Sequence, residues 1–308
     1  MPPAVAPAAQ MGWPRPSCRR KHGGNFANSP ARERRLGEQG MEVVVVGVRP
    51  DGTVDLEALE RAIAPGTVLV SVMTANNEIG TLQPLGEIAA LAHRHGALFH
   101  TDAAQGAGKV PIDVRAMDID LLSLTAHKMY GPKGSGALFV HKRKPRLSLE
   151  PQIDGGGQEA GIRSGTLNVP AIVGLGRACE ICRLEMADES RRLAALRDAL
   201  LEGLRTRAGG VTVNGTLERR LPHNLHVSFA DVEGEALLMA LGDVAVSTGS
   251  ACSSGSQKPS HVLEAIGAVG QRAGASIRFG LGRMTTRDEV DYAIDRVSTI
   301  VAALRGRA

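Results

Sequence analysis

The sequence has few aromatic residues, few cysteines and no long apolar run. One Trp, two Tyr and five Phe occur among 308 residues, so a hydrophobic core has to come from Val, Leu, Ile and Ala. No apolar run approaches the roughly 20 residues that a membrane span needs. Four cysteines are too few for a secreted disulfide scaffold and favour a reducing compartment. We therefore expect a soluble, cytoplasmic protein with no membrane partner.

Positive charge is concentrated at the start of the chain. The net charge is +4, but residues 1–40 contain seven basic and two acidic side chains, so the remaining residues are nearly neutral. A basic tail on a neutral body is not the clustered charge of a nucleic-acid groove, and we expect no direct nucleic-acid partner. Residues 1–28 lack the apolar segment of a secretory signal. We expect a disordered, atypical tail there, and a transit peptide or an alternative start remains open.

Short apolar segments alternate with amphipathic ones in the first half of the chain. Turn residues such as Pro50-Asp51-Gly52 separate them, and this alternation predicts βαβ units in an α/β fold with a mainly parallel sheet flanked by helices. The predicted strands are Val43–Val48, Val68–Met73, Ala97–Thr101, Asp120–Leu124 and Gly136–His141.

The second half has a different pattern. Ala171–Arg207 is predicted to be one long helix, and strands are indicated again only from Val211 onwards. We expect residues 29–185 to form a large domain that includes the start of this helix. Residues 186–308 are expected to form a smaller α+β domain.

Polar residues follow three successive predicted strands. Because ligands bind beyond the carboxyl ends of parallel strands, we expect Asn77, Asp102, Gln105 and Lys128 to lie along one edge of the sheet. A lysine held there can react with an aldehyde cofactor, and a carboxylate can pair with the cofactor's ring nitrogen. From spacing alone, a solvated strand end for Lys128 and a helix cap for Asp102 remain open.

The sequences of six segments, taken together, resemble those of the cysteine desulfurases, the NifS/IscS-like group of the class-V aminotransferase family. The match extends from about residue 29 to residue 304 and implies the fold-type-I architecture of pyridoxal-phosphate enzymes. The segments are VSVMTANNEIGTLQP (70–84), FHTDAAQGAGKVP (99–111), residues 121–136, DGGGQEAGIRSGTL (154–167), VSTGSACSSGSQKPSHVL (246–263) and SIRFGLGRMTT (276–286).

The resemblance implies pyridoxal 5'-phosphate as the cofactor and assigns residues to it. Lys128 matches the lysine that binds the cofactor covalently, and Asp102 matches the partner of its ring nitrogen. Gln105 matches a donor to its phenolic oxygen, and Asn77 matches a residue at the cofactor and the substrate carboxylate.

Further positions match the phosphate and substrate contacts. Thr125 and His127 match phosphate contacts within the chain, and Thr166 matches one that a partner subunit supplies, which implies a homodimer. Arg278 matches the arginine that binds the substrate carboxylate through two parallel hydrogen bonds.

Cys252 matches the nucleophile that takes sulfur from L-cysteine as a persulfide and leaves L-alanine. Its Ser- and Gly-rich surroundings predict an exposed loop rather than the apolar site of a structural cysteine. The resemblance implies a sulfur acceptor or iron–sulfur scaffold as a partner, for cluster assembly or tRNA thiolation. It implies that Cys252 holds metal only transiently, through a shared iron–sulfur cluster.

Other motifs favour structural roles. Cys179 and Cys182 form a C-x-x-C inside the predicted long helix, with no second pair to complete a zinc site, so we expect them to be structural. Residues 131–136 lack the residue order of a P-loop. The histidines lack metal-ligand spacing.

The resemblance breaks at the N-terminus. The family's leading Gly-Ala-Thr-Glu-Ser-Asn-Asn segment, which cradles the cofactor phosphate, is not recognisable in residues 1–28, and neither is its ring-stacking histidine. We therefore expect weak cofactor binding and an exposed sheet edge. Another class-V activity, such as a selenocysteine lyase or an aminotransferase, and a truncated, non-catalytic chain that only binds a partner remain alternatives.

Overall fold

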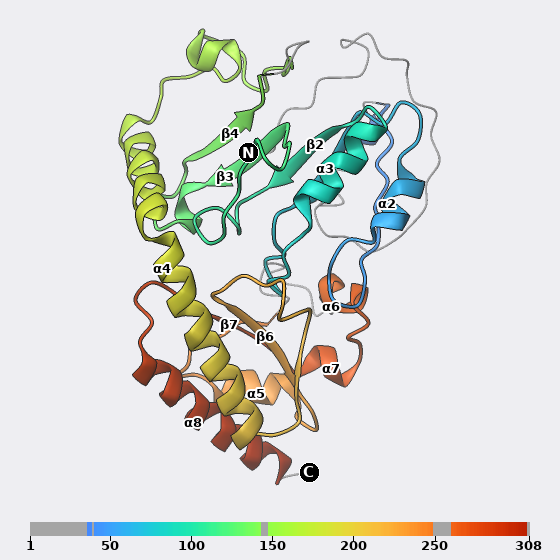
Figure 1. Ribbon diagram of the computed structural model, residues 1–308. Coiled ribbons are helices and arrows are strands. Elements are labelled where there is room, and N and C mark those ends of the chain that lie inside the picture. The colour runs from blue at the N-terminus through green and yellow to red at the C-terminus, as the bar shows by residue number, and fades with distance from the viewer. Residues whose placement is uncertain (1–35, 39, 143–146, 249–259, 307–308) are drawn as a thin grey trace.

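The computed structural model describes residues 36–38, 40–142, 147–248 and 260–306. In this part of the chain, two β-sheets are joined by one long helix, α4 (Val169–Arg207), which runs from the first sheet to the second (Figure 1). Asn168 caps this helix, because its side chain accepts a hydrogen bond from the Ala171 amide. None of the described helices is long and apolar enough to cross a lipid bilayer.

The first sheet has the strand order β1-β2-β3-β4. The first three strands are parallel, and the fourth is antiparallel to β3. The predicted α/β class with a mainly parallel sheet is therefore confirmed. The strands are β1 (Leu69–Met73), β2 (Leu98–Asp102), β3 (Leu121–Thr125) and β4 (Gly136–Val140).

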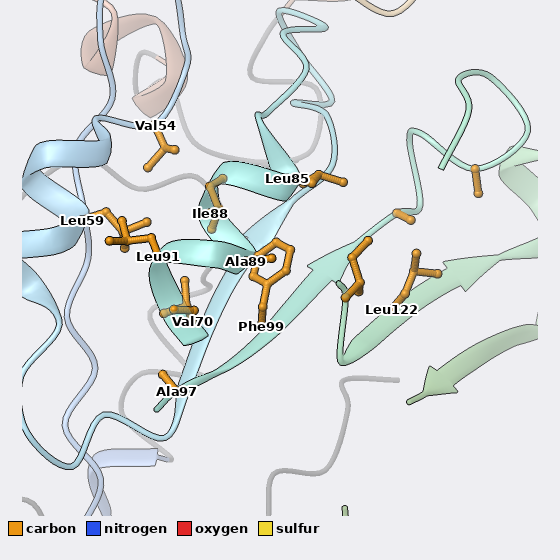
Figure 2. Close-up of a cluster of buried hydrophobic side chains, with 14 of the residues drawn as sticks. Val54, Leu59, Val70, Leu85, Ile88, Ala89, Leu91, Ala97, Phe99 and Leu122 are labelled. Carbon is orange, nitrogen blue, oxygen red and sulfur yellow. The ribbon is translucent and has the colours of Figure 1, made fainter. Parts of the chain in front are cut away.

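Helices α2 (Leu56–Ala62) and α3 (Leu85–Arg94) contribute to the core beside this sheet. Asp55 caps α2 by accepting hydrogen bonds from two amides of its first turn. Ile88 of α3 and Phe99 of β2 belong to one cluster of buried side chains (Figure 2), and both are fully buried. Their burial fixes α3 against the sheet, so that the loops at both ends of β2 have defined positions.

The second sheet is antiparallel, with the order β5-β6-β7. Alternate residues of β6 lie on opposite faces: Leu225 and Val227 join the apolar core beneath the sheet, whereas Asn224 and His226 lie on the other face. The elements of this part are β5 (Val211–Val213), β6 (Asn224–Phe229), α5 (Gly234–Ala240), α6 (His261–Ala265), α7 (Gln271–Gly274), β7 (Ser276–Gly280) and α8 (Arg287–Arg305).

The two halves of α4 pack against different cores. Leu175 and Cys182 belong to the core of the first sheet, whereas Leu193 and Leu204 belong to the core of the second. We propose the domain division between residues 185 and 186 on this basis, since it falls between the two groups.

The predicted strand Val43–Val48 is wrong. Within the described residues, this segment makes only one isolated bridge, between Val48 and Val54, and Val44 is exposed. An apolar, β-branched run favours extended backbone, but a strand also needs a neighbouring backbone with which to form hydrogen bonds. Among the described residues, no strand pairs with the outer side of β1.

Candidate active site

The carboxyl ends of three parallel strands meet at one edge of the first sheet. The strand register places Met73, Asp102 and Ser123 side by side, so that the segments following β1, β2 and β3 start from neighbouring positions. This is the edge at which open α/β sheets bind ligands. The structure therefore brings together the segments that carry Asn77, Asp102 and Lys128.

Asp102 ends β2 and is exposed. Its Oδ1 atom accepts a hydrogen bond from the Ala104 amide at 2.9 Å. The carboxylate therefore caps the following turn through Oδ1, and its Oδ2 atom accepts no hydrogen bond from the described residues, which suits it to pair with a cationic ring nitrogen. Gln105 is half-buried in the same turn. Capping and ligand binding are thus compatible roles for Asp102.

Lys128 ends the short 3-10 helix η2 (Ala126–Lys128), directly after β3, and is exposed. The Thr125 hydroxyl and the His127 Nδ1 atom lie 2.9 Å apart at the start of this helix. A Cβ at Gly136 would lie 2.5 Å from the Leu124 carbonyl oxygen, so the close pairing of β4 with the end of β3 requires glycine there.

Arg278 reaches this edge from β7 of the second sheet. Its Nη1 atom donates to the Asn77 carbonyl oxygen at 2.7 Å, across 201 positions of sequence. Backbone hydrogen bonds in both directions with Ser247 hold the arginine from the other side. The arginine that the resemblance assigns to the substrate carboxylate thus lies beside the loop that follows β1.

The loop 74–80 is itself buried against the second domain. Asn76 Oδ1 accepts the amides of Glu78 and Ile79, which closes a tight turn. The Glu78 carboxylate accepts a hydrogen bond from Ser260 at 2.5 Å, and burial raises the pKa of this carboxyl despite that bond. These contacts fix Asn77 against both domains.

The remaining predicted site residues are Thr166 and Cys252. Thr166 is exposed on the segment that precedes α4. Its contact with the cofactor phosphate in a partner subunit's site stays a prediction. Cys252 lies outside the described residues. In α4, Cys179 is exposed and Cys182 is buried, both as free thiols. The described ranges contain no cluster of three or more His, Cys, Asp or Glu side chains that could hold a metal ion.

Sequence reasoning missed two buried histidines beside this site, because it tested them only for metal-ligand spacing. His223 precedes β6 and His226 lies within it, opposite Arg278 on β7. One ring nitrogen of each is buried without a hydrogen-bond partner among the described residues. Burial, and then nearby cations, lowers the pKa of His223 to about 4 and that of His226 to about 3.

We expect stability to fall steeply between pH 7 and pH 5. The unfolded chain protonates these histidines near pH 6.5, whereas the folded chain keeps them neutral down to about pH 4 and pH 3. Stability is therefore full above pH 6.5 and is lost as the pH falls below it, by about 2 kcal/mol per histidine at pH 5. Urea unfolding at both pH values measures the loss.

The test variant is His226→Gln, which should weaken the pH dependence of stability. The matched control is His95→Gln. His95 lies at the C-terminal end of α3, with 39% of its side chain exposed. An unchanged pH dependence in His226→Gln would contradict the expectation.

The donor set at the sheet edge fits pyridoxal phosphate. Lys128 would supply a primary amine for the cofactor's aldehyde, and Asp102 would supply a carboxylate for its protonated ring nitrogen. The Thr125–His127 pair supplies donors for a phosphate. The fit to pyridoxal phosphate rests on the chemical types of these side chains rather than on any one distance.

The chain matches the family model for class-V aminotransferases over residues 24–293. It is 53% identical to a cysteine desulfurase IscS of Anaeromyxobacter sp. (strain K) over 289 residues, which is 94% of this chain and 70% of that protein. A mitochondrial cysteine desulfurase of Arabidopsis thaliana is 51% identical over 88% of this chain and 60% of its own length. A solved NifS-like protein superposes with a TM-score of 0.82 at 36% identity, covering 92% of this chain and 74% of that one.

The family match and the fold together define a pyridoxal-phosphate-dependent enzyme of fold type I. The mainly parallel sheet and the smaller antiparallel sheet are the two parts of that architecture in this chain. The chain belongs to the class-V aminotransferase family, as a homologue of the cysteine desulfurases. The sequence-based resemblance to this family is therefore confirmed.

Proposed function

We propose that this chain is a cysteine desulfurase that converts L-cysteine to L-alanine and keeps the sulfur as a persulfide on Cys252. The observation that carries the proposal is the hydrogen bond from Arg278 to the Asn77 carbonyl. It places an arginine of the small domain beside the loop that follows β1, at the edge where the Lys128 segment also begins.

Pyridoxal phosphate, when bound, supplies an electron sink that makes bonds to the substrate's α-carbon easier to break. Lys128 would hold its aldehyde carbon covalently. Asp102 would keep its ring nitrogen protonated, with Gln105 donating to its phenolic oxygen. Thr125 and His127 would bind the phosphate, joined by Thr166 of a second copy of the chain.

Arg278 would orient the substrate through its carboxylate. A guanidinium presents two parallel N–H donors that match the two carboxylate oxygens, which fixes the substrate's direction as well as its position. Asn77 would lie next to this carboxylate, since its own carbonyl already accepts from the same arginine.

Cys252 would perform the sulfur transfer. Its thiolate attacks the substrate sulfur, so that an S–S bond forms and the substrate's C–S bond breaks. The electron pair of the broken bond stays with the carbon skeleton, which takes up a proton and leaves as alanine. The persulfide then passes to an acceptor or iron–sulfur scaffold, through which Cys252 would touch metal only transiently. A cytoplasmic location stays a prediction from cysteine usage.

A second copy of the chain is the partner that the surface favours. Thr166 lies in a stretch of exposed apolar side chains that leads into the first turns of α4, and such a patch favours burial against another protein. A homodimer would cover this patch and deliver Thr166 to the neighbouring site. The patch contains Ile162, Leu167, Val169, Ile172 and Val173.

Replacing Cys252 by serine tests the function. We expect alanine formation from cysteine to fall by about a thousandfold or more, because the sulfur loses its nucleophile, while cofactor binding is unchanged. Cys179→Ser is the matched control, since this exposed thiol on α4 has no role in the proposal. The assay follows alanine and sulfide without any 2-oxo acid.

Alanine formation at the normal rate in Cys252→Ser would overturn the assignment. A strict requirement for a 2-oxo acid acceptor would instead show an aminotransferase. Faster turnover of selenocysteine that does not need Cys252 would show a lyase for that substrate.

A further inference from the structure

Three side chains from three segments of the chain converge on Glu189 of α4. Lys109 comes from the loop after β2, Tyr130 from the turn after η2, and Arg283 from the loop after β7. We call Lys109, Tyr130, Glu189 and Arg283 the Glu189 cluster. It joins both domains to the helix that connects them.

The contacts in the Glu189 cluster use both carboxylate oxygens. Oε1 accepts from Lys109 Nζ at 3.3 Å, and Oε2 accepts from Arg283 Nε and Nη2 at 2.8 and 2.6 Å. The Tyr130 ring contacts both cations: Lys109 Nζ lies 4.2 Å and Arg283 Cζ lies 4.7 Å from its centroid. The Arg283 amide donates to the Tyr130 hydroxyl at 2.8 Å.

These ion pairs are shielded from water. The side chains of Lys109 and Glu189 are only 8% and 9% exposed, so their attraction is weakly screened by solvent. Burial alone would raise the pKa of Glu189, but the hydrogen bonds and charges of Arg283 and Lys109 outweigh it and hold that pKa below its ordinary value. The carboxylate is thus charged at neutral pH, and losing it would leave two cations close together.

Each of the other three residues of the Glu189 cluster lies within a few positions of a proposed site residue. Tyr130 follows Lys128 by two positions and has a left-handed backbone, with φ of 63°. A non-glycine residue in that conformation is held there by its surroundings, here by the hydroxyl and both cations. Lys109 follows Gln105 in the same turn, and Arg283 follows Arg278 in the segment that leaves β7.

Backbone contacts strengthen the same connection. Ser190 donates to the Lys109 carbonyl at 2.7 Å, and Arg192 donates to the carbonyls of Arg283 and Thr285, each at 2.7 Å. One turn of α4 therefore binds the loop of the large domain and the loop of the small domain at once.

We propose that the Glu189 cluster is a positioning device that sets Arg278 of the small domain at a fixed distance from Lys128 of the large domain. This inference rests on the proposed function, because the proposed function assigns substrate binding to Arg278. The residues of the Glu189 cluster act through Arg278 and Lys128, so they are positioning residues rather than catalytic ones.

The test compares Glu189→Gln with Asp188→Asn. Asp188 is the neighbouring residue on α4 and carries the same charge, but its ion pair with Arg191 is fully on the surface. We expect Glu189→Gln to raise KM for cysteine about tenfold or more and to change kcat less than threefold. The reason is that misplacing Arg278 weakens carboxylate binding first. Asp188→Asn should leave both constants unchanged.

A second measurement does not depend on turnover. Hydrogen exchange of the cofactor-free chain should quicken in peptides covering 125–135 and 276–286 in Glu189→Gln, and in neither peptide in Asp188→Asn. Tyr130→Phe removes only the hydroxyl. It should produce part of the increase in the hydrogen-exchange rate of the peptide covering 276–286.

Uniformly faster exchange, or equal losses in kcat and in cysteine affinity, would reduce Glu189 to a general stabilising residue and overturn the proposal. Unchanged KM and unchanged exchange would do the same. If the wild-type chain formed no alanine, the proposed function would fail, and the exchange pattern alone would decide whether the cluster couples the two segments.

Discussion

Lys128→Ala should abolish covalent binding of pyridoxal phosphate and lower alanine formation by about a thousandfold or more, because no other proposed site residue supplies a primary amine. Lys128 is exposed at the end of η2, so removing its side chain should leave the folded state intact. Titration of the full chain with pyridoxal phosphate, followed by the visible absorbance of the lysine-bound cofactor, measures the loss. Thermal unfolding checks the fold.

The matched control is Lys133→Ala. Lys133 is another exposed lysine, five residues further along the connection between β3 and β4. We expect it to keep the absorbance and the activity. The same absorbance in Lys128→Ala, at the same stoichiometry, would show that a different amine holds the cofactor and would displace Lys128 from the proposed site.

Gly234→Ala should destabilise the small domain by about 3 kcal/mol or more, since the added carbon collides with backbone that cannot easily move. Gly234 begins α5, and a Cβ there would lie 1.8 Å from the carbonyl oxygen of Gly274, at the end of α7. Relief would require the two helices to separate. Urea unfolding followed by circular dichroism measures the difference.

Gly86→Ala is the control for this substitution. Gly86 lies in the first turn of α3, where an added Cβ meets nothing within 4 Å. Alanine has the higher helix propensity, so this variant should gain up to about 1 kcal/mol. A loss of less than about 1 kcal/mol in Gly234→Ala would show that α5 and α7 can shift apart at little cost.

The sequence predicted the local elements that have strong local signals. Val68–Met73 and Ala97–Thr101 were expected as strands, and β1 and β2 agree within one residue. The long helix also agrees, at 169–207 against the predicted 171–207. The failure at Val43–Val48 has a physical cause: its residues favour extended backbone, but pairing depends on what lies alongside.

Site prediction had the same limit. The family wording pointed to Asn77, Asp102, Lys128 and Arg278, and the parallel strand order brings the first three segments to one edge. Nothing in the local pattern indicated Glu189, which lies in the middle of a long helix among other charged residues. Glu189 is singled out only by its hydrogen bonds from Lys109 and Arg283, which come from two different loops.

The sequence by itself determined the α/β class, the order of the elements and the chemical types gathered near the strand ends, because side-chain periodicity, turn residues and motif wording are local properties. Only the tertiary structure decided which distant segments meet. The bond from Arg278 to Asn77 and the burial of Glu189 between two cations depend on how α4 packs against both sheets. Such contacts arise from the burial of both cores together, and no short stretch of sequence records them.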